Sequence, residues 1–143
     1  MRAVVCGIGN VLRGDDAIGP MAIERMRGMF DGVLLVDCGP APENFAGKIV
    51  KEKPSAVIII DAVEMGDRPG TVKEIPVDKV KAEFATTHKM PITVFIEYLQ
   101  KNTEADITFI GVQQKSTGFG HEMSDECASS VDDVICMVSK LVA

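Results

Sequence analysis

Two adjacent carboxylates, Asp15 and Asp16, lie in a turn where a phosphate-binding loop would be expected. The turn joins an apolar strand, expected over residues 2–8, to a segment with helical spacing. A strand, a glycine-bearing turn and a helix start normally form a cradle for anions, because backbone amides point into it. Carboxylates would repel an anion there, so we expect the bound group to be a cation.

Further polar side chains follow the other apolar strands. Asp37 and Cys38 follow the second strand, Asp61 ends the third, and His88 precedes a helix expected from Pro91. Other polar residues near strand ends include Asn10, Glu64, Gln113, Gln114, Ser116, Thr117 and His121. In open parallel sheets ligands bind beyond the carboxyl ends of the strands. We therefore expect three or four acids and a histidine to meet at one edge.

Asp16, Asp61 and His88 are the candidate metal-binding and catalytic residues. Two carboxylates and one imidazole leave open positions for water or substrate, as catalytic metal sites require. Such mixed ligation suits nickel, zinc, iron or cobalt and does not choose among them. Each residue also has an ordinary interpretation: a helix cap for Asp15 or Asp16, an acceptor for the next turn at Asp61, and a surface histidine at position 88.

A dinucleotide-binding module is the alternative that the same region leaves open. Gly7 and Gly9 follow the first strand and Asp37 ends the second, as in nicotinamide-cofactor domains. However, Leu12 replaces the third glycine of that pattern, and the acidic pair would repel a pyrophosphate. A partial glycine motif is weak support.

The elements that would position these residues alternate along the chain. Strands are expected over residues 2–8, 32–37, 56–61, 71–77 and 106–113. Helices are expected over residues 20–29 and 91–101, from Pro42, and from Ser124. The segment 71–77 alternates polar and apolar residues, which favours an antiparallel edge strand. The pattern predicts a three-layer α/β/α sandwich with a mostly parallel sheet.

Length and charge exclude several classes of partner. The 143 residues fit one domain spanning 1–143, and the net charge of -6 argues against nucleic acid or an anionic membrane surface. Apolar runs fall far short of the roughly 20 residues that span a bilayer, and no signal peptide is visible. Four cysteines without close-paired spacing fit reduced thiols in the cytoplasm.

A family resemblance covers nearly the whole chain. Residues 9–20 (GNVLRGDDAIGP) resemble the opening signature of the hydrogenase maturation proteases. Residues 37–44 (DCGPAPEN) resemble the second loop of that family, and residues 60–62 (IDA) the end of its third strand. Thr-His at 87–88 and Gly-Val-Gln at 111–113, followed by a glycine-rich loop, continue the same order.

The resemblance implies an endopeptidase that removes a short C-terminal extension from the precursor of a nickel-iron hydrogenase large subunit. Cleavage in this family follows insertion of the nickel-iron centre. The family's metal-binding trio falls on Asp16, Asp61 and His88. Nickel would then be supplied by the nickel-loaded substrate protein, with zinc or cadmium able to substitute in vitro, and a carboxylate would act as general base.

The same resemblance implies a fold and separates the two adjacent acids. The sheet should be twisted and five-stranded, with one antiparallel strand, in a protein that we expect to be a monomer. Asp16 is the expected metal contact, whereas Asp15 caps the helix or shapes the loop. A non-catalytic chaperone that senses the same metal centre remains an alternative at this point.

Overall fold

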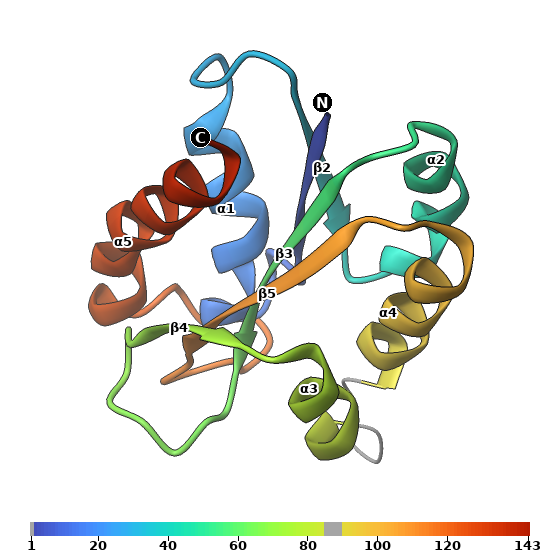
Figure 1. The fold of residues 1–143 in the computed structure, drawn as a ribbon. Helices are drawn as coiled ribbons and strands as arrows, with labels where there is room; N and C mark the ends of the chain where they lie inside the picture. Colours follow the sequence, from blue (N-terminus) through green and yellow to red (C-terminus); the bar gives the residue numbers. More distant parts are fainter. Residues whose placement is uncertain (1, 85–89) are drawn as a thin grey trace.

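The computed structural model describes residues 2–84 and 90–143, which form a twisted open sheet with helices on both faces (Figure 1). Its strands are β1 (Ala3–Ile8), β2 (Val33–Gly39), β3 (Ala56–Val63), β4 (Val72–Ile75) and β5 (Asp106–Gln113). The strand order is β2-β1-β3-β5-β4, and neighbours pair in parallel except that β4 lies antiparallel to β5. The expected five-stranded, mostly parallel sheet is therefore confirmed.

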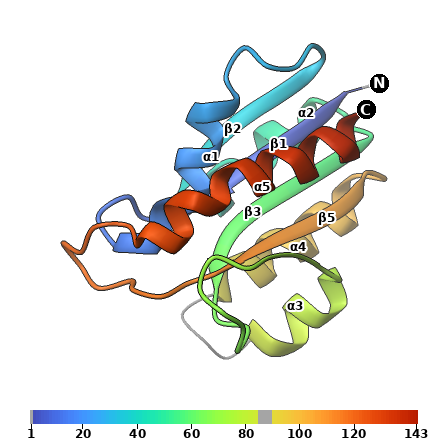
Figure 2. The same cartoon turned by 90° about the vertical axis from the view of Figure 1, so that its left-hand side faces the viewer.

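Helices cover the sheet in two layers. They are α1 (Ile18–Met26), α2 (Ala46–Lys51), α3 (Val77–Phe84), α4 (Met90–Asn102) and α5 (Asp125–Val142), with short 3-10 helices η1 (Gly14–Ala17) and η2 (Pro42–Asn44). In Figures 1 and 2, α1 and α5 lie on one face and α2 and α4 on the other. No helix in the described part of the chain is long and apolar enough to cross a membrane.

The β-branched run of β3 explains why both faces are covered. Side chains of a strand alternate between the faces of the sheet. Ile59 therefore belongs to the cluster that contains Phe95 of α4. Ile58 belongs to the opposite cluster, with Ile23 of α1 and Val134 of α5. A strand that is apolar on both faces must be central, so the three-layer α/β/α architecture is confirmed.

Close packing brings α1 directly against the strand ends. A Cβ atom at Gly19 would overlap the carbonyl oxygen of Ile8 and lie 2.8 Å from that of Ile60. Any larger residue at position 19 would push the helix away from the sheet. The glycine thus allows η1, which precedes α1, to contact β3 as well as the turn after β1.

The strand expected over residues 71–77 is shorter, and a helix that the pattern did not predict follows it. β4 ends at Ile75 and α3 begins at Val77. The carbonyl oxygen of Pro76 accepts a hydrogen bond from the amide of Val80 (3.1 Å), so the proline stands at the start of the helix, where its missing N–H is tolerated. The expected end was wrong because Ile75 and Val77 continue the strand alternation, while Val77 and Val80 have helical spacing.

The first helix is also displaced from its expected range of 20–29. It begins at Ile18 and ends at Met26. Gly28 has a φ of 79°, a left-handed conformation that commonly ends a helix. Met29 therefore lies beyond the helix and is 52% exposed, so the expected end of the helix at residue 29 is wrong.

Candidate functional site

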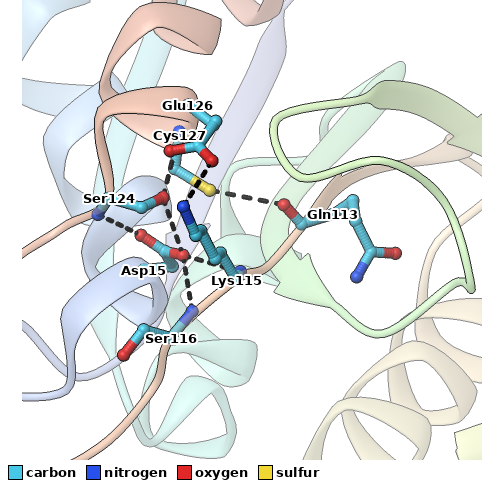
Figure 3. A network of polar contacts seen from close by, with 7 residues as sticks. All are labelled: Asp15, Gln113, Lys115, Ser116, Ser124, Glu126 and Cys127. Carbon is cyan, nitrogen blue, oxygen red and sulfur yellow. Dashed lines mark hydrogen bonds and ion pairs between the residues drawn. The ribbon is translucent and has the colours of Figure 1, made fainter.

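Asp15 is completely buried and binds the loop between β5 and α5 (Figure 3). Its Oδ2 atom accepts hydrogen bonds from the amides of Lys115 (2.7 Å) and Ser116 (2.9 Å), and its Oδ1 atom accepts one from the amide of Ser124 (2.7 Å). The Ser124 hydroxyl donates to Oδ2 (3.0 Å) and also accepts from the amide of Cys127, as the N-cap of α5. Asp15 therefore holds this loop against the acidic turn.

Hydrogen bonding keeps Asp15 ionised. Burial alone would raise the pKa of its carboxyl, because a charge is disfavoured away from water. The hydrogen bonds from Ser116, Ser124 and Lys115 act in the opposite direction, and the resulting pKa lies below its ordinary value. Of the two roles expected for Asp15, shaping the loop is confirmed, whereas α1 begins without a side-chain cap.

Asp16, the next residue, lies half-buried at the surface of the same turn. Its Oδ2 atom accepts a hydrogen bond from the amide of Asn10 (2.8 Å). Gly9 has a φ of 148°, and a Cβ atom there would overlap the carbonyl oxygen of Asp16. Glycine at position 9 therefore makes room for the backbone of the acidic turn.

Asp61 lies inside β3, not at its end. The strand was expected to stop at Asp61, but it continues to Val63 and pairs Asp61 with Gly111 of β5. Asp61 is 1% exposed, and alternation places it on the same face as Ile59 and Val63, which pack in the cluster of α4. The strand continued because apolar residues follow the aspartate, so a single polar residue was a poor marker of its end.

His88 lies outside the described residues, two positions before α4. The last residue of α4 leads through a short turn to the start of β5, so α4 runs against the strand direction (Figure 1). The first turn of α4 is therefore at the carboxyl edge of the sheet, the edge that also carries η1. Among the residues that are described, no three His, Cys, Asp or Glu side chains gather as a metal site. The structure brings η1, with Asp16, against β3, with Asp61, and the trio with His88 stays a prediction.

Gln113, at the end of β5, organises a second loop beside this edge. It is 2% exposed, and its Oε1 atom accepts hydrogen bonds from the amides of Met65 (2.7 Å) and Asp67 (3.2 Å). Its Nε2 atom donates to Glu64 (2.9 Å) and to the carbonyl oxygen of Gln114 (2.9 Å). Glu64 thus supports the loop after β3. This role was not predicted, since a glutamine at a strand end gives no signal of which amides it will bind.

Two of the four cysteines have thiols that ionise less readily than usual. Cys6, Cys38 and Cys127 are buried free thiols, and Cys136 is an exposed one. A hydrogen bond with Cys38 and burial raise the pKa of Cys6 well above its ordinary value. Burial raises the pKa of Cys127 to about 11. A thiol must ionise to act as a nucleophile or metal ligand, so the buried sulfurs of Cys6 and Cys127 fit packing roles.

The family model of HycI hydrogenase maturation proteases matches residues 21–141. The chain belongs to the hydrogenase maturation protease family. It is 32% identical over 136 residues to the hydrogenase 3 maturation protease of Escherichia coli K12, spanning 94% of this chain and 86% of that protein. A putative hydrogenase maturation protease of Methanocaldococcus jannaschii is 29% identical over 150 residues, covering 99% of this chain and 88% of that protein.

Solved structures of hydrogenase maturation proteases share this fold. The crystal structure of the [NiFe] hydrogenase maturation protease HycI from Thermococcus kodakarensis KOD1 has a TM-score of 0.87 and 34% identity, covering 97% of this chain and 90% of that one. The crystal structure of the hydrogenase 3 maturation protease has a TM-score of 0.83 and 31% identity, covering 94% and 86%. Membership of this protease family favours the endopeptidase interpretation over the dinucleotide-binding one.

Proposed function

We propose that this hydrogenase maturation protease removes the C-terminal extension of a nickel-iron hydrogenase large-subunit precursor in the cytoplasm, after nickel has been inserted. The observation that carries the proposal is the packing of η1, with the accessible Asp16, against β3, with the buried Asp61. Both elements meet at the carboxyl edge, where α4 begins. Family membership supplies the reaction class, and the two carboxylates supply the means to recognise a cation.

Nickel held by the precursor would reach Asp16 first and then Asp61 and His88. Carboxylate oxygen and imidazole nitrogen suit nickel as a mixed ligand set. Asp61 is almost fully buried, where Coulomb interactions are stronger than in water. A precursor without nickel would bring no cation to these carboxylates. Metal loading is then the signal that permits cleavage.

The same residues would support hydrolysis of the peptide bond. A carboxylate accepts a proton from the attacking water while the oxygen of that water bonds to the scissile carbonyl carbon. The C–N bond then breaks, and the proton passes to the leaving amine. Nickel close to the carbonyl would polarise it and stabilise the negative charge that develops on its oxygen. We assign these roles to the set Asp16, Asp61 and His88.

The proposal is tested by mixing the protein with nickel-loaded and nickel-free large-subunit precursor from the same genome. We expect a shortened product only from the loaded precursor, and none with the Asp16→Ala variant. Asp31→Ala is the matched control, because Asp31 is exposed in the turn before β2, at the opposite end of the sheet. Equal cleavage of both precursors, or full activity of Asp16→Ala, would refute nickel recognition. Binding of loaded precursor without cleavage would indicate a chaperone.

Metal binding by the isolated protein provides a second test. We expect zinc or cadmium to bind in vitro, because both accept oxygen and nitrogen ligands. Calorimetric titration of cadmium should show one site that is lost in Asp16→Ala and kept in Asp31→Ala. Heat of binding that is equal in the two variants would place the metal elsewhere.

A further inference from the structure

The most exposed large apolar side chains of the described residues lie on two loops beside Asp16. Val11 is 64% exposed and Leu12 is 56% exposed, both in the turn after β1, and Phe119 in the loop after β5 is 69% exposed. The other exposed large apolar residues are Met21, Met29, Val94 and Tyr98. Single exposed apolar residues are ordinary, but a group on adjoining loops marks an interaction surface.

Backbone hydrogen bonds join the two loops that carry these side chains. The amide of Gly120 donates to the carbonyl oxygen of Leu12 (2.7 Å), and the amide of Gly14 donates to that of His121 (3.0 Å). The Ser116 hydroxyl and the Nδ1 atom of His121 lie 2.7 Å apart, which closes the second loop on itself. Exposed apolar groups on a fixed backbone lose little entropy on binding, as expected for a preformed contact surface.

The position of this surface connects it to the metal contact. Asn10 donates its amide to Asp16 Oδ2 (2.8 Å) and accepts the amide of Leu12 on its own Oδ1 (2.9 Å). One short turn therefore carries both the carboxylate and two of the apolar side chains. A protein whose bound metal reached Asp16 would therefore come close to the turn that carries Val11 and Leu12.

The residues of the two loops indicate which side chains of a partner this surface can bind. Residues 9–14 and 116–121 contain no acidic residue, and they are directly followed by the acidic pair Asp15 and Asp16 and by the exposed Glu122. Arg13 is the charged residue within these two ranges, and its guanidinium lies 3.5 Å from the carbonyl oxygen of Thr117. The three large apolar side chains of this surface are exposed, so it is suited to apolar side chains of a partner.

We propose that Val11, Leu12 and Phe119 form a docking patch for apolar residues that flank the nickel centre of the large-subunit precursor. This inference rests on the proposed function, since it assigns the same precursor to a second contact. The carboxylates bind the metal, and the docking patch binds the protein that carries the metal. Affinity for the precursor then depends on the patch, whereas the chemical step depends on Asp16.

The test uses the variants Leu12→Ser and Phe119→Ser with Met29→Ser as matched control. Met29 is 52% exposed and lies just before β2, at the amino ends of the parallel strands and away from the docking patch. We expect each patch variant to raise KM for nickel-loaded precursor about tenfold or more, as truncation of an interface hot spot does. The value of kcat, the melting temperature and cadmium affinity should match those of the control.

Three outcomes would overturn the docking patch. One is a KM that stays equal to that of the control. Another is a parallel loss of cadmium binding, which would show that these loops only shape the metal site. The third is a dimer in sedimentation that Phe119→Ser converts to monomers, which would assign the patch to a second copy of the chain.

The proposed function and the docking patch fail in different ways. If the wild-type protein binds loaded precursor but does not cleave it, the protease proposal fails, and the patch is judged by the dissociation constant of the same variants. If the wild-type protein cleaves precursor and the patch variants do so with unchanged KM, only the patch is overturned. If no loaded precursor is bound at all, both are overturned.

Discussion

Asp15 and Asp16 are neighbours in one 3-10 turn, yet they face opposite surroundings. Asp15 is fully buried and accepts hydrogen bonds from three loop amides and a hydroxyl. Asp16 is half-buried and lies where a partner can reach it. The two carboxylates of this short turn therefore have different roles. Asp15 fixes the backbone of the turn, and that fixed backbone holds Asp16 at the surface. Four changes would break or sharpen this division.

The largest effect is expected on activity from Asp16→Asn. Asparagine keeps the shape of the side chain and an oxygen for the Asn10 amide, but it removes the charge that a metal requires. We expect cleavage of nickel-loaded precursor to fall at least about a hundredfold, because the loss of one ligand charge costs several kcal/mol of transition-state stabilisation. The melting temperature should stay within about 2 °C of wild type. A stability loss as large as that of Asp15→Ala would contradict the division.

The second effect is on stability, from Asp15→Ala. The change leaves the partly buried amides of Lys115, Ser116 and Ser124 without their acceptor, and an unsatisfied group that is fully buried costs about 1–3 kcal/mol. Water that enters the space recovers part of this, so we expect a loss of about 3 kcal/mol in the free energy of unfolding. Urea unfolding followed by circular dichroism measures it, with Asp31→Ala as the exposed control. A loss below about 1 kcal/mol would show that the loop is held by other contacts.

A third, smaller effect concerns acid. The pKa of Asp15 is lowered in the folded protein, so its contribution is complete above the ordinary pKa of about 3.9 and is lost as the pH falls through the lowered value. The difference in unfolding free energy between wild type and Asp15→Asn should be constant above about pH 5 and shrink below about pH 4. Unfolding curves from pH 2 to 7 test this. A difference in unfolding free energy that grows toward low pH would contradict the lowered pKa of Asp15 in the folded protein.

The smallest effect is expected from Ser124→Ala. This change removes the N-cap of α5 and one of the hydrogen bonds to Asp15, while the Ser124 amide remains in place. Loss of an N-cap costs about 1 kcal/mol. Combined with Asp15→Ala, it should cost less than the sum of the two changes, because the residues share a contact. Strict additivity in this double-mutant cycle would show that the N-cap of α5 and the hydrogen bonds of Asp15 stabilise the protein independently.

Sequence patterns predicted the sheet because its strands are made from simple runs. The apolar, β-branched run that became β3 specifies burial on both faces, and the alternation at 71–77 correctly indicated an antiparallel edge. Strand ends were less accurate, since Asp61 looked like an end and is an interior residue of β3. The helix α3 was missed because Val77 satisfies both the strand and the helix spacing.

The candidate site was only partly within reach of the sequence. Asp16 was singled out by its charge in a turn that normally accepts anions. A loop-shaping role was among those expected for Asp15, but its partners were not predicted, because they are backbone amides about a hundred positions away and an amide looks the same at every residue. Gln113 was noted at a strand end, but its burial and its hold on the loop after β3 depend on the packed structure.

The large sequence separation between Asp15 and its hydrogen-bond partners also sets the order in which contacts can form as the protein folds. Its hydrogen bond to Ser124 joins residues 109 positions apart, and contacts between distant parts of a chain tend to form late. At a synthesis rate of roughly 5–20 residues per second, the acidic turn would leave the ribosome about 5–20 seconds before its loop partners do. During that interval the turn lacks the hydrogen bonds that Asp15 makes to the loop before α5. We therefore expect the nascent chain to ignore nickel-bearing precursors, and recognition to begin only when α5 has docked.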